Sequence, residues 1–472
     1  MGQVEDREVA YSADFVYQNH GFSAGLFVVV RDGIIEEITS DPGDVPRCNW
    51  PGMAIMPGFV NAHSHVFQRV IRGRVQGVPV ANPEADFWSW REGMYRAAGA
   101  MTPEALAVIA RYTYIEMLLA GFTSVAEFHY LHHQVGGRPY GDRGALGRGV
   151  IEGAQAANIR LTLLPVAYGR GGPGRPLEEA QARFGHRDVA DFFETVESYQ
   201  AGASGSGSLP VGLGLAIHSV RAVESGWFGP IAAYAEARGW PLHAHGCEQP
   251  REIELCLEEH GVEPLALLDG EGVLSPRMTL VHGVHLAPGD IERLRSRGAT
   301  VCACPTTERD LGDGILPATA LGAAGVPLAL GTDSHAQIDP FAEMQGLEGH
   351  SRLQSLRRCQ LLEPATDNME KREVGPALIN AATRGGEAAM GMAIGALEPG
   401  CPADFIAVDL NHRRVLGVGQ DQLPSAIAMG GQLGSIREVV VGGTRVVKGG
   451  HHPQLEEAAR DFRALTRHIY GD

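Results

Sequence analysis

The chain alternates short apolar runs with longer segments of helical periodicity, and this alternation restricts the folds that it can adopt. Eight runs rich in Val, Leu or Thr and flanked by Gly, Pro or Asp cover residues 54–62, 121–129, 160–168, 211–219, 241–248, 278–284, 300–306 and 327–335. Such an alternation is typical of parallel strands joined by crossover helices. Eight repeats of this kind predict an α/β fold, a closed (β/α)8 TIM barrel.

One intervening segment shows the expected helical pattern clearly. Apolar or aromatic residues recur at helical spacing between residues 103 and 119, at Val108, Tyr112, Ile115 and Leu119. A proline stands in the first turn and a glycine follows directly after the last, as is common at helix ends. We therefore predict a helix over residues 103–119.

The two ends of the chain have a different pattern, that of antiparallel hairpins. Apolar runs flank Asp32-Gly33 near the start and Gly442-Gly443 near the end, and both dipeptides favour tight two-residue turns. Both hairpins lie outside the predicted barrel, so we place them in one small β-sandwich domain. The predicted domains are residues 1–57 plus 398–452 for the β domain, 58–397 for the barrel and 453–472 for a closing helix.

Polar residues stand where the predicted barrel strands end, which is where barrel enzymes carry their chemistry. They are His63, His65, Glu127, His129, His218, His245, His282 and Asp333. His63 and His65 are two residues apart on one strand, so their side chains share a face and can reach one ion. Neutral imidazoles and a carboxylate are suitable ligands for a divalent metal.

Each of these polar residues has a simpler explanation when it is taken alone. His243 and His282, for example, can be hydrogen-bonded structural groups at strand ends. A carboxylate such as Asp333 is costly to bury unless it is paired or binds a metal. The coincidence of several such residues at four strand ends favours a metal site. Cys302 and Cys304 share a strand face but have no second cysteine pair nearby, so we do not expect zinc there.

Charge and composition exclude several classes of partner. The chain of 472 residues has 39 Lys and Arg against 56 Asp and Glu, a formal charge of -17. This balance argues against nucleic acid or an anionic membrane as the main partner. No apolar segment approaches the length of a membrane span, the acidic start lacks the pattern of a secretory signal, and seven scattered cysteines fit reduced thiols. We expect a cytoplasmic protein.

At these residues the chain resembles the amidohydrolase superfamily. The run 56–65 (MPGFVNAHSH) is similar to the segment that opens the barrel, and 395–404 (GALEPGCPAD) to the return to the β domain. The resemblance to the one-metal deaminase branch implies that the metal is bound by His63, His65, His245 and Asp333. It also implies proton transfer and polarisation by Glu248, His282 and Asp333. Zn²⁺ is the expected ion, one per chain, and Fe²⁺ also fits.

Less generic stretches resemble the formimidoylglutamate deiminase family of histidine degradation. They are residues 65–69, 87–92 with 94–96, 126–133, 218–223 and 311–319. Gly93, Arg309-Asp310 and the segment 338–341 depart from the family pattern, which puts the shape of these loops in doubt. The resemblance implies hydrolysis of N-formimino-L-glutamate to N-formyl-L-glutamate and ammonia. It also leads us to expect a homodimer.

A substrate with two carboxylates needs local cations in so acidic a chain. Arg91 and Arg221 are our candidates, because a guanidinium pairs with a carboxylate through two hydrogen bonds. Neutral contacts from Gln68, Tyr130 and His218 complete the predicted substrate site. For Arg91 the alternative is a helix-surface arginine paired with Glu92. The neighbouring aromatic residues Phe87, Trp88 and Trp90 fit a lid or a subunit contact as well as a substrate role.

Two other functions remain open at this stage. One is a deaminase or dechlorinase of a flat, neutral heterocycle such as guanine, cytosine or a triazine, which has no need of two arginines. The other is a metal-free scaffold built on the same barrel. The scaffold predicts lost ligands, whereas all the expected ligand positions carry suitable residues.

Overall fold

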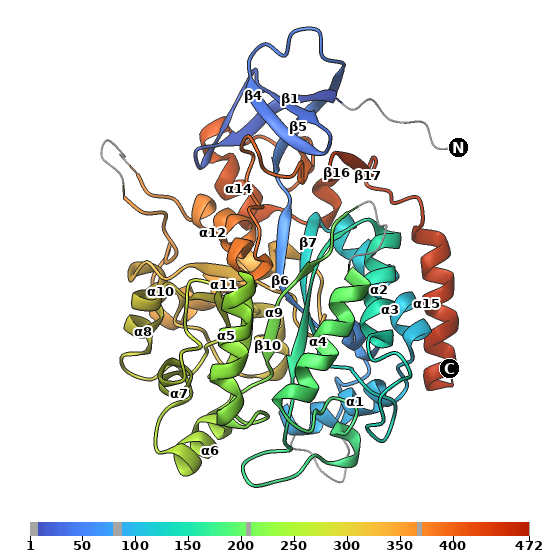
Figure 1. The fold of residues 1–472 in the computed structure, drawn as a ribbon. Helices are drawn as coiled ribbons and strands as arrows, with labels where there is room; N and C mark the ends of the chain where they lie inside the picture. The colour runs from blue at the N-terminus through green and yellow to red at the C-terminus, as the bar shows by residue number, and fades with distance from the viewer. Residues whose placement is uncertain (1–7, 79–86, 204–208, 366–370, 472) are drawn as a thin grey trace.

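The computed structural model describes residues 8–78, 87–203, 209–365 and 371–471. A parallel barrel forms the body of the molecule, and a second sheet built from both ends of the chain lies at one end of it (Figure 1). Within the described residues, none of the helices combines the length and the apolar character that crossing a membrane requires.

Eight parallel strands in sequence order form the barrel, as predicted. They are β6 (Phe59–Ser64), β7 (Phe122–His129), β8 (Arg160–Ala167), β10 (Leu215–Ile217), β11 (Leu242–Gly246), β12 (Met278–His282), β13 (Thr300–Ala303) and β14 (Leu328–Leu330), with the short β9 (Gly212–Leu213) beside β8. The barrel closes just beyond β14. There, Thr332 N donates to His63 O at 3.1 Å and His65 N donates to Asp333 O at 3.0 Å. Closure therefore brings the first and last polar strand ends together.

Helices cover the outside of the barrel and the joints between its strands. They are α1 (Phe87–Gly99), α2 (Pro103–Leu119), α3 (Ala145–Ala157), α4 (Val189–Ala203), α5 (Phe228–Arg238), α6 (Pro250–His260), α7 (Pro264–Gly270), α8 (Asp290–Arg297), α9 (Pro305–Leu311), α10 (Ala318–Ala323), α11 (Pro340–Ser355), α12 (Val374–Ala382), α13 (Glu387–Met390), α14 (Leu423–Gly430) and α15 (Leu455–Tyr470).

Helix α2 matches the segment predicted from periodicity, and its burial shows what the predicted apolar stripe contacts. Thr102 caps its first turn by accepting a hydrogen bond from Ala105 N at 3.1 Å. The fully buried residues include Leu106, Ile109 and Tyr114, whereas Tyr112 is only half-buried. Tyr112 stacks on Phe462 of α15, with ring centroids 4.4 Å apart. The predicted apolar face of α2 therefore includes Tyr112, on which helix α15 packs.

The second sheet joins strands from the two ends of the chain. It contains β1 (Glu8–Gln18), β2 (Gly21–Ser23), β3 (Phe27–Arg31), β4 (Ile34–Thr39), β5 (Arg47–Pro57), β15 (Phe405–Asp409), β16 (Ile436–Val441) and β17 (Thr444–Val447). The predicted hairpins are β3–β4 and β16–β17. Their turn residues all have positive φ, 50° and 81° at Asp32-Gly33 and 54° and 76° at Gly442-Gly443. The exact residue boundaries of the two domains stay a prediction.

Candidate metal centre and active site

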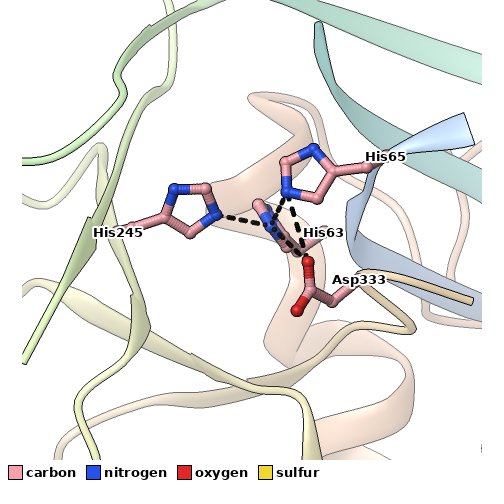
Figure 2. A group of neighbouring side chains, drawn as sticks. All are labelled: His63, His65, His245 and Asp333. Atoms are coloured by element: carbon pink, nitrogen blue, oxygen red, sulfur yellow. Dashed lines mark hydrogen bonds and ion pairs between the residues drawn. The ribbon is translucent and has the colours of Figure 1, made fainter. Parts of the chain in front are cut away.

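Four buried side chains converge at the mouth of the barrel (Figure 2). His63 lies near the end of β6 and His65 directly follows it, His245 lies near the end of β11, and Asp333 follows β14. The Nε2 atom of His63 lies 3.1 Å from Nε2 of His65 and 3.0 Å from Nε2 of His245. Asp333 Oδ1 lies 3.3 Å and 3.2 Å from the same two atoms of His63 and His65. The structure brings together the four residues that we predicted as ligands.

The hydrogen bonds on the far side of the rings explain why their Nε2 atoms face one another. His65 Nδ1 donates to Phe128 O at 3.0 Å, and His245 Nδ1 donates to His218 O at 2.9 Å. With Nδ1 as the donor, Nε2 is the nitrogen that each of these rings turns toward the common point. Burial lowers the pKa of His63 to about 3, so this ring is neutral as well.

This donor set fits a metal ion. Facing nitrogen lone pairs repel one another unless a cation lies between them. Tetrahedral ligands about 2.0–2.1 Å from zinc are separated by about 3.3 Å, close to the spacing of these atoms. Three neutral imidazoles and one carboxylate also match the ligands that zinc and related divalent ions prefer.

A buried polar network holds the strand ends that carry these side chains. Glu127 accepts hydrogen bonds from Ser64 Oγ at 2.5 Å and from Val66 N at 2.7 Å, on the two sides of His65. Ser64 Oγ also lies 3.1 Å from His335 Nε2, which connects β6 to the segment after β14. Asp333 itself has a φ of 44°, an uncommon left-handed backbone that turns its side chain toward the histidines.

The predicted proton-transfer groups lie beside this cluster. His282 Nε2 is 3.6 Å from Glu248 Oε1 and 3.8 Å from Asp333 Oδ2. Burial raises the pKa of Glu248, although the nearby His282 opposes the shift. Burial alone would lower the pKa of His282, but the surrounding carboxylates override burial and raise it well above the usual value. The two groups are therefore poised to share a proton.

All five predicted substrate-binding residues line one cavity above the cluster. The cavity is bounded by Gln68, Arg91, Tyr130, His218 and Arg221, together with Glu248, His282 and Asp333. Gln68 Nε2 donates to Tyr130 Oη at 2.8 Å. Arg91 is not a simple surface residue, because it lines the cavity and lies over the Tyr95 ring, 5.3 Å from its centroid.

The aromatic residues near Arg91 and the histidine near His245 do not all lie at the site. Trp90 also lines the cavity, whereas the side chains of Phe87 and Trp88 lie outside the described part of the structure. His243 points away from the cluster, and its Nε2 lies 3.0 Å from Ala389 O. Ser219 and Tyr168 complete the wall next to His218.

Sequence reasoning missed three buried carboxyl groups near the cavity. Glu308 Oε1 lies 3.5 Å from His282 Nδ1, and Glu252 lines the cavity wall. Asp313 groups with Glu248 and His282, and burial followed by the charge of Glu248 raises its pKa to about 9. Asp313 lies in the run 311–319 that suggested the family, which was a usable signal. Nothing in the local pattern marks Glu252, on the first turns of α6.

The fold and this site together define a class of protein. Polar ligands at the carboxyl ends of barrel strands, with acid and base groups beside them, are typical of a metal-dependent hydrolase. Comparison with protein families agrees, because residues 54–446 match the amidohydrolase family. The chain belongs to this family of metal-dependent enzymes and is a hydrolase that acts on C–N bonds, of the deaminase type.

Three similar proteins place the chain within the family. It is 37% identical to a formimidoylglutamate deiminase of Pseudomonas aeruginosa, over 92% of this chain and 94% of the relative. It is 30% identical to an 8-oxoguanine deaminase of the same species, over 92% of each. A crystal structure of an amidohydrolase from Brucella melitensis is 32% identical, with a TM-score of 0.87 over 98% of this chain and all of the other.

Proposed function

We propose that the protein hydrolyses N-formimino-L-glutamate to N-formyl-L-glutamate and ammonia. The observation that carries this proposal is that one cavity joins the histidine and aspartate cluster to two arginines, Arg91 and Arg221. A metal ion held by the cluster can activate water for attack on a C=N bond. The two arginines can bind the two carboxylates of the substrate. The similarity to a formimidoylglutamate deiminase supports the same substrate.

The proposed metal site consists of His63, His65, His245 and Asp333. Zn²⁺ is the preferred ion because imidazole nitrogens predominate, and Fe²⁺ is the second choice. When bound, such an ion lowers the pKa of water and supplies a hydroxide nucleophile at neutral pH. The four side chains leave one side of the cluster facing the cavity, where Asp333 lines its wall.

The acid and base steps fall to three residues that lie around one point. Asp333 Oδ2 lies 3.8 Å from His282 Nε2, between the metal cluster and the proton-transfer groups, so we assign to Asp333 the acceptance of the proton of the attacking water. His282 faces the carbon under attack and stabilises the charge that develops there. Glu248, 3.6 Å from His282, delivers a proton to the departing nitrogen, which leaves as ammonia.

The walls of the cavity supply the substrate contacts. Arg91 and Arg221 each pair with one carboxylate of the substrate. The neutral groups of Gln68, Tyr130 and His218 bind its remaining polar atoms. Buried Gln68 Oε1 has no hydrogen-bond partner among the described residues, so it offers an acceptor to a substrate N–H.

A heterocycle deaminase is the competing function, and the 30% identity to an 8-oxoguanine deaminase favours it. Flat neutral bases are recognised by stacking and by neutral hydrogen-bond partners. Such a base offers no carboxylate to the two half-buried arginines that line the cavity. The arginines therefore favour the acidic formimino compound.

Ammonia release from purified, zinc-loaded protein separates the two functions. We expect turnover of N-formimino-L-glutamate and little or none of guanine, 8-oxoguanine or cytosine. Removal of the metal by a chelator should abolish the activity, and added Zn²⁺ should restore it. Turnover of a base with none of the formimino acid would contradict the proposal.

A further inference from the structure

Arg170 is a buried arginine that lies just outside the catalytic cavity. It follows β8 and is only 3% exposed. A buried guanidinium is costly unless its N–H groups are bonded. The partners of Arg170 therefore indicate what it does in the fold.

One set of partners is the turn that carries Arg221. This turn, residues 219–222, is closed by a hydrogen bond from Ala222 N to Ser219 O at 3.1 Å. Arg170 Nη2 donates to Val220 O at 3.0 Å, and Arg170 N donates to Ala222 O at 3.0 Å. The Arg170 side chain thus holds the carbonyl group before Arg221, whereas the carbonyl group after it is held by the backbone N–H groups of Arg170 and of Gly169, the latter at 2.8 Å.

The other partner is helix α6, which begins two residues after Glu248. The Arg170 guanidinium forms a two-pronged ion pair with Glu259 in the last turns of α6, with Nη2 to Oε2 at 2.8 Å. The same guanidinium lies 3.6 Å from Glu224, just beyond the Arg221 turn. Arg170 therefore links the segments that follow β8 and β10 to the carboxyl-terminal end of helix α6.

The geometry points to Arg170 as the residue that positions Arg221 for binding of a substrate carboxylate. This role rests on the proposed function, in which Arg221 pairs with that carboxylate. Two-pronged pairing with a carboxylate requires the guanidinium plane to be placed within a fraction of an ångström. Because the carbonyl groups on both sides of Arg221 are hydrogen-bonded, its backbone is fixed. The long Arg221 side chain therefore extends toward the substrate carboxylate from one defined position. Arg170 acts through Arg221 and does not itself line the cavity.

The test compares Arg170→Ala and Arg170→Lys with Arg251→Ala. Arg251 is a suitable control, because it is also paired with glutamates of α6, Glu254 and Glu258, but is exposed and forms these pairs within the helix. We expect Arg170→Ala to raise KM for N-formimino-L-glutamate by about tenfold while kcat stays within about threefold. The KM of Arg170→Lys should lie between those of Arg170→Ala and the wild type. Lysine keeps a positively charged donor but cannot form the two parallel hydrogen bonds of a guanidinium.

Hydrogen–deuterium exchange provides a reading that does not depend on the substrate. Peptides that cover residues 218–224 should exchange faster in Arg170→Ala, with no change in Arg251→Ala. Unchanged exchange in this turn would overturn the role of Arg170, as would a loss in kcat with KM unaltered. If the wild type fails to release ammonia from the formimino acid, the proposed function fails, and the exchange experiment still decides whether Arg170 holds the turn. If Arg170→Ala does not fold, KM and hydrogen exchange are compared in Arg170→Lys and Glu259→Gln instead.

Discussion

At the scale of single residues, each side chain of the candidate metal cluster depends on a partner that is not itself a ligand. His65 and His245 face the common point because backbone carbonyls accept the hydrogen bonds of their Nδ1 atoms. Glu127 accepts hydrogen bonds from the Ser64 hydroxyl and from the Val66 backbone N–H, on the two sides of His65. Residues of this kind are expected to influence metal affinity almost as strongly as the ligands do.

Glu127→Gln tests this dependence. The amide replaces a carboxylate oxygen by an N–H₂ group, which cannot accept from Ser64 and Val66 at the same time. We expect metal affinity to fall by about 10- to 100-fold, measured by competition with a chromophoric chelator. Ser198→Ala, which removes a half-buried hydroxyl bonded to Thr195 O within α4, provides the control. An unchanged affinity in Glu127→Gln would remove Glu127 from the support of the site.

Arg221→Ala tests the substrate contact itself. Loss of the guanidinium leaves a substrate carboxylate unpaired inside the cavity. We expect kcat/KM for N-formimino-L-glutamate to fall roughly 30-fold or more, equivalent to about 2 kcal/mol or more. Arg238→Ala is the matched control, because Arg238 is exposed and lies over Tyr234 outside the cavity. Steady-state kinetics with an unchanged kcat/KM would exclude Arg221 from substrate binding.

At the scale of elements, the second sheet is fastened to the barrel by a buried ion pair. Arg160 begins β8, and its guanidinium binds the Asp404 carboxylate before β15 at 2.6 Å and 3.0 Å. Asp404 also accepts a hydrogen bond from Gly442 N at 2.7 Å, in the β16–β17 turn. Both charged side chains are almost fully buried. This contact ties one barrel strand to a sheet whose strands come from both ends of the chain.

Arg160→Met should therefore be strongly destabilising. Loss of one partner leaves the other charge buried without compensation, at a cost of about 3–5 kcal/mol. A double change, Arg160→Met with Asp404→Leu, should recover much of that loss, because it removes both buried charges. Urea unfolding of the metal-loaded proteins measures the difference. Arg31→Met, which breaks an exposed pair with Glu8 in the same sheet, should have little effect.

At the scale of the whole molecule, several buried histidines outside the metal cluster make stability depend on pH. Burial lowers the pKa of His129 and of His186 to about 3, and that of His243 to about 4. The unfolded chain binds protons at these residues below about pH 6.5, whereas the folded chain does not. Their contribution to stability is therefore complete above that pH and is lost progressively as the pH falls toward 3.

His186→Phe tests this dependence at one position. Both ring nitrogens of His186 lack hydrogen-bond partners among the described residues, and the ring packs against Phe192 with centroids 5.2 Å apart. A phenyl ring should keep this packing and remove the proton-binding group. We expect the stability lost between pH 6.5 and pH 5 to decrease by about 1.1 kcal/mol per pH unit on average relative to the wild type. Equal slopes for the two proteins, measured at equal metal content, would contradict this account.

The barrel could be predicted from local pattern because each strand has its own apolar run and parallel strands end at the same edge. The two hairpins could be predicted because Asp32-Gly33 and Gly442-Gly443 adopt the positive φ that their turns require. The predicted metal ligands come together in the structure for the same reason, because they stand where strands end and a barrel brings all of these ends to one mouth. Gln68 and Arg91 lie on helices instead, and only the family resemblance indicated them.

The barrel, its strand order and the polar residues at its mouth therefore follow from the amino-acid sequence, because spacing along the chain governs each of them. The groups that lie behind those residues are defined by the three-dimensional packing. Glu308 beside His282, Glu127 around His65 and Arg170 around Arg221 all depend on contacts between separate strands and loops. Such contacts follow from barrel closure and loop packing, and no local periodicity encodes these distances.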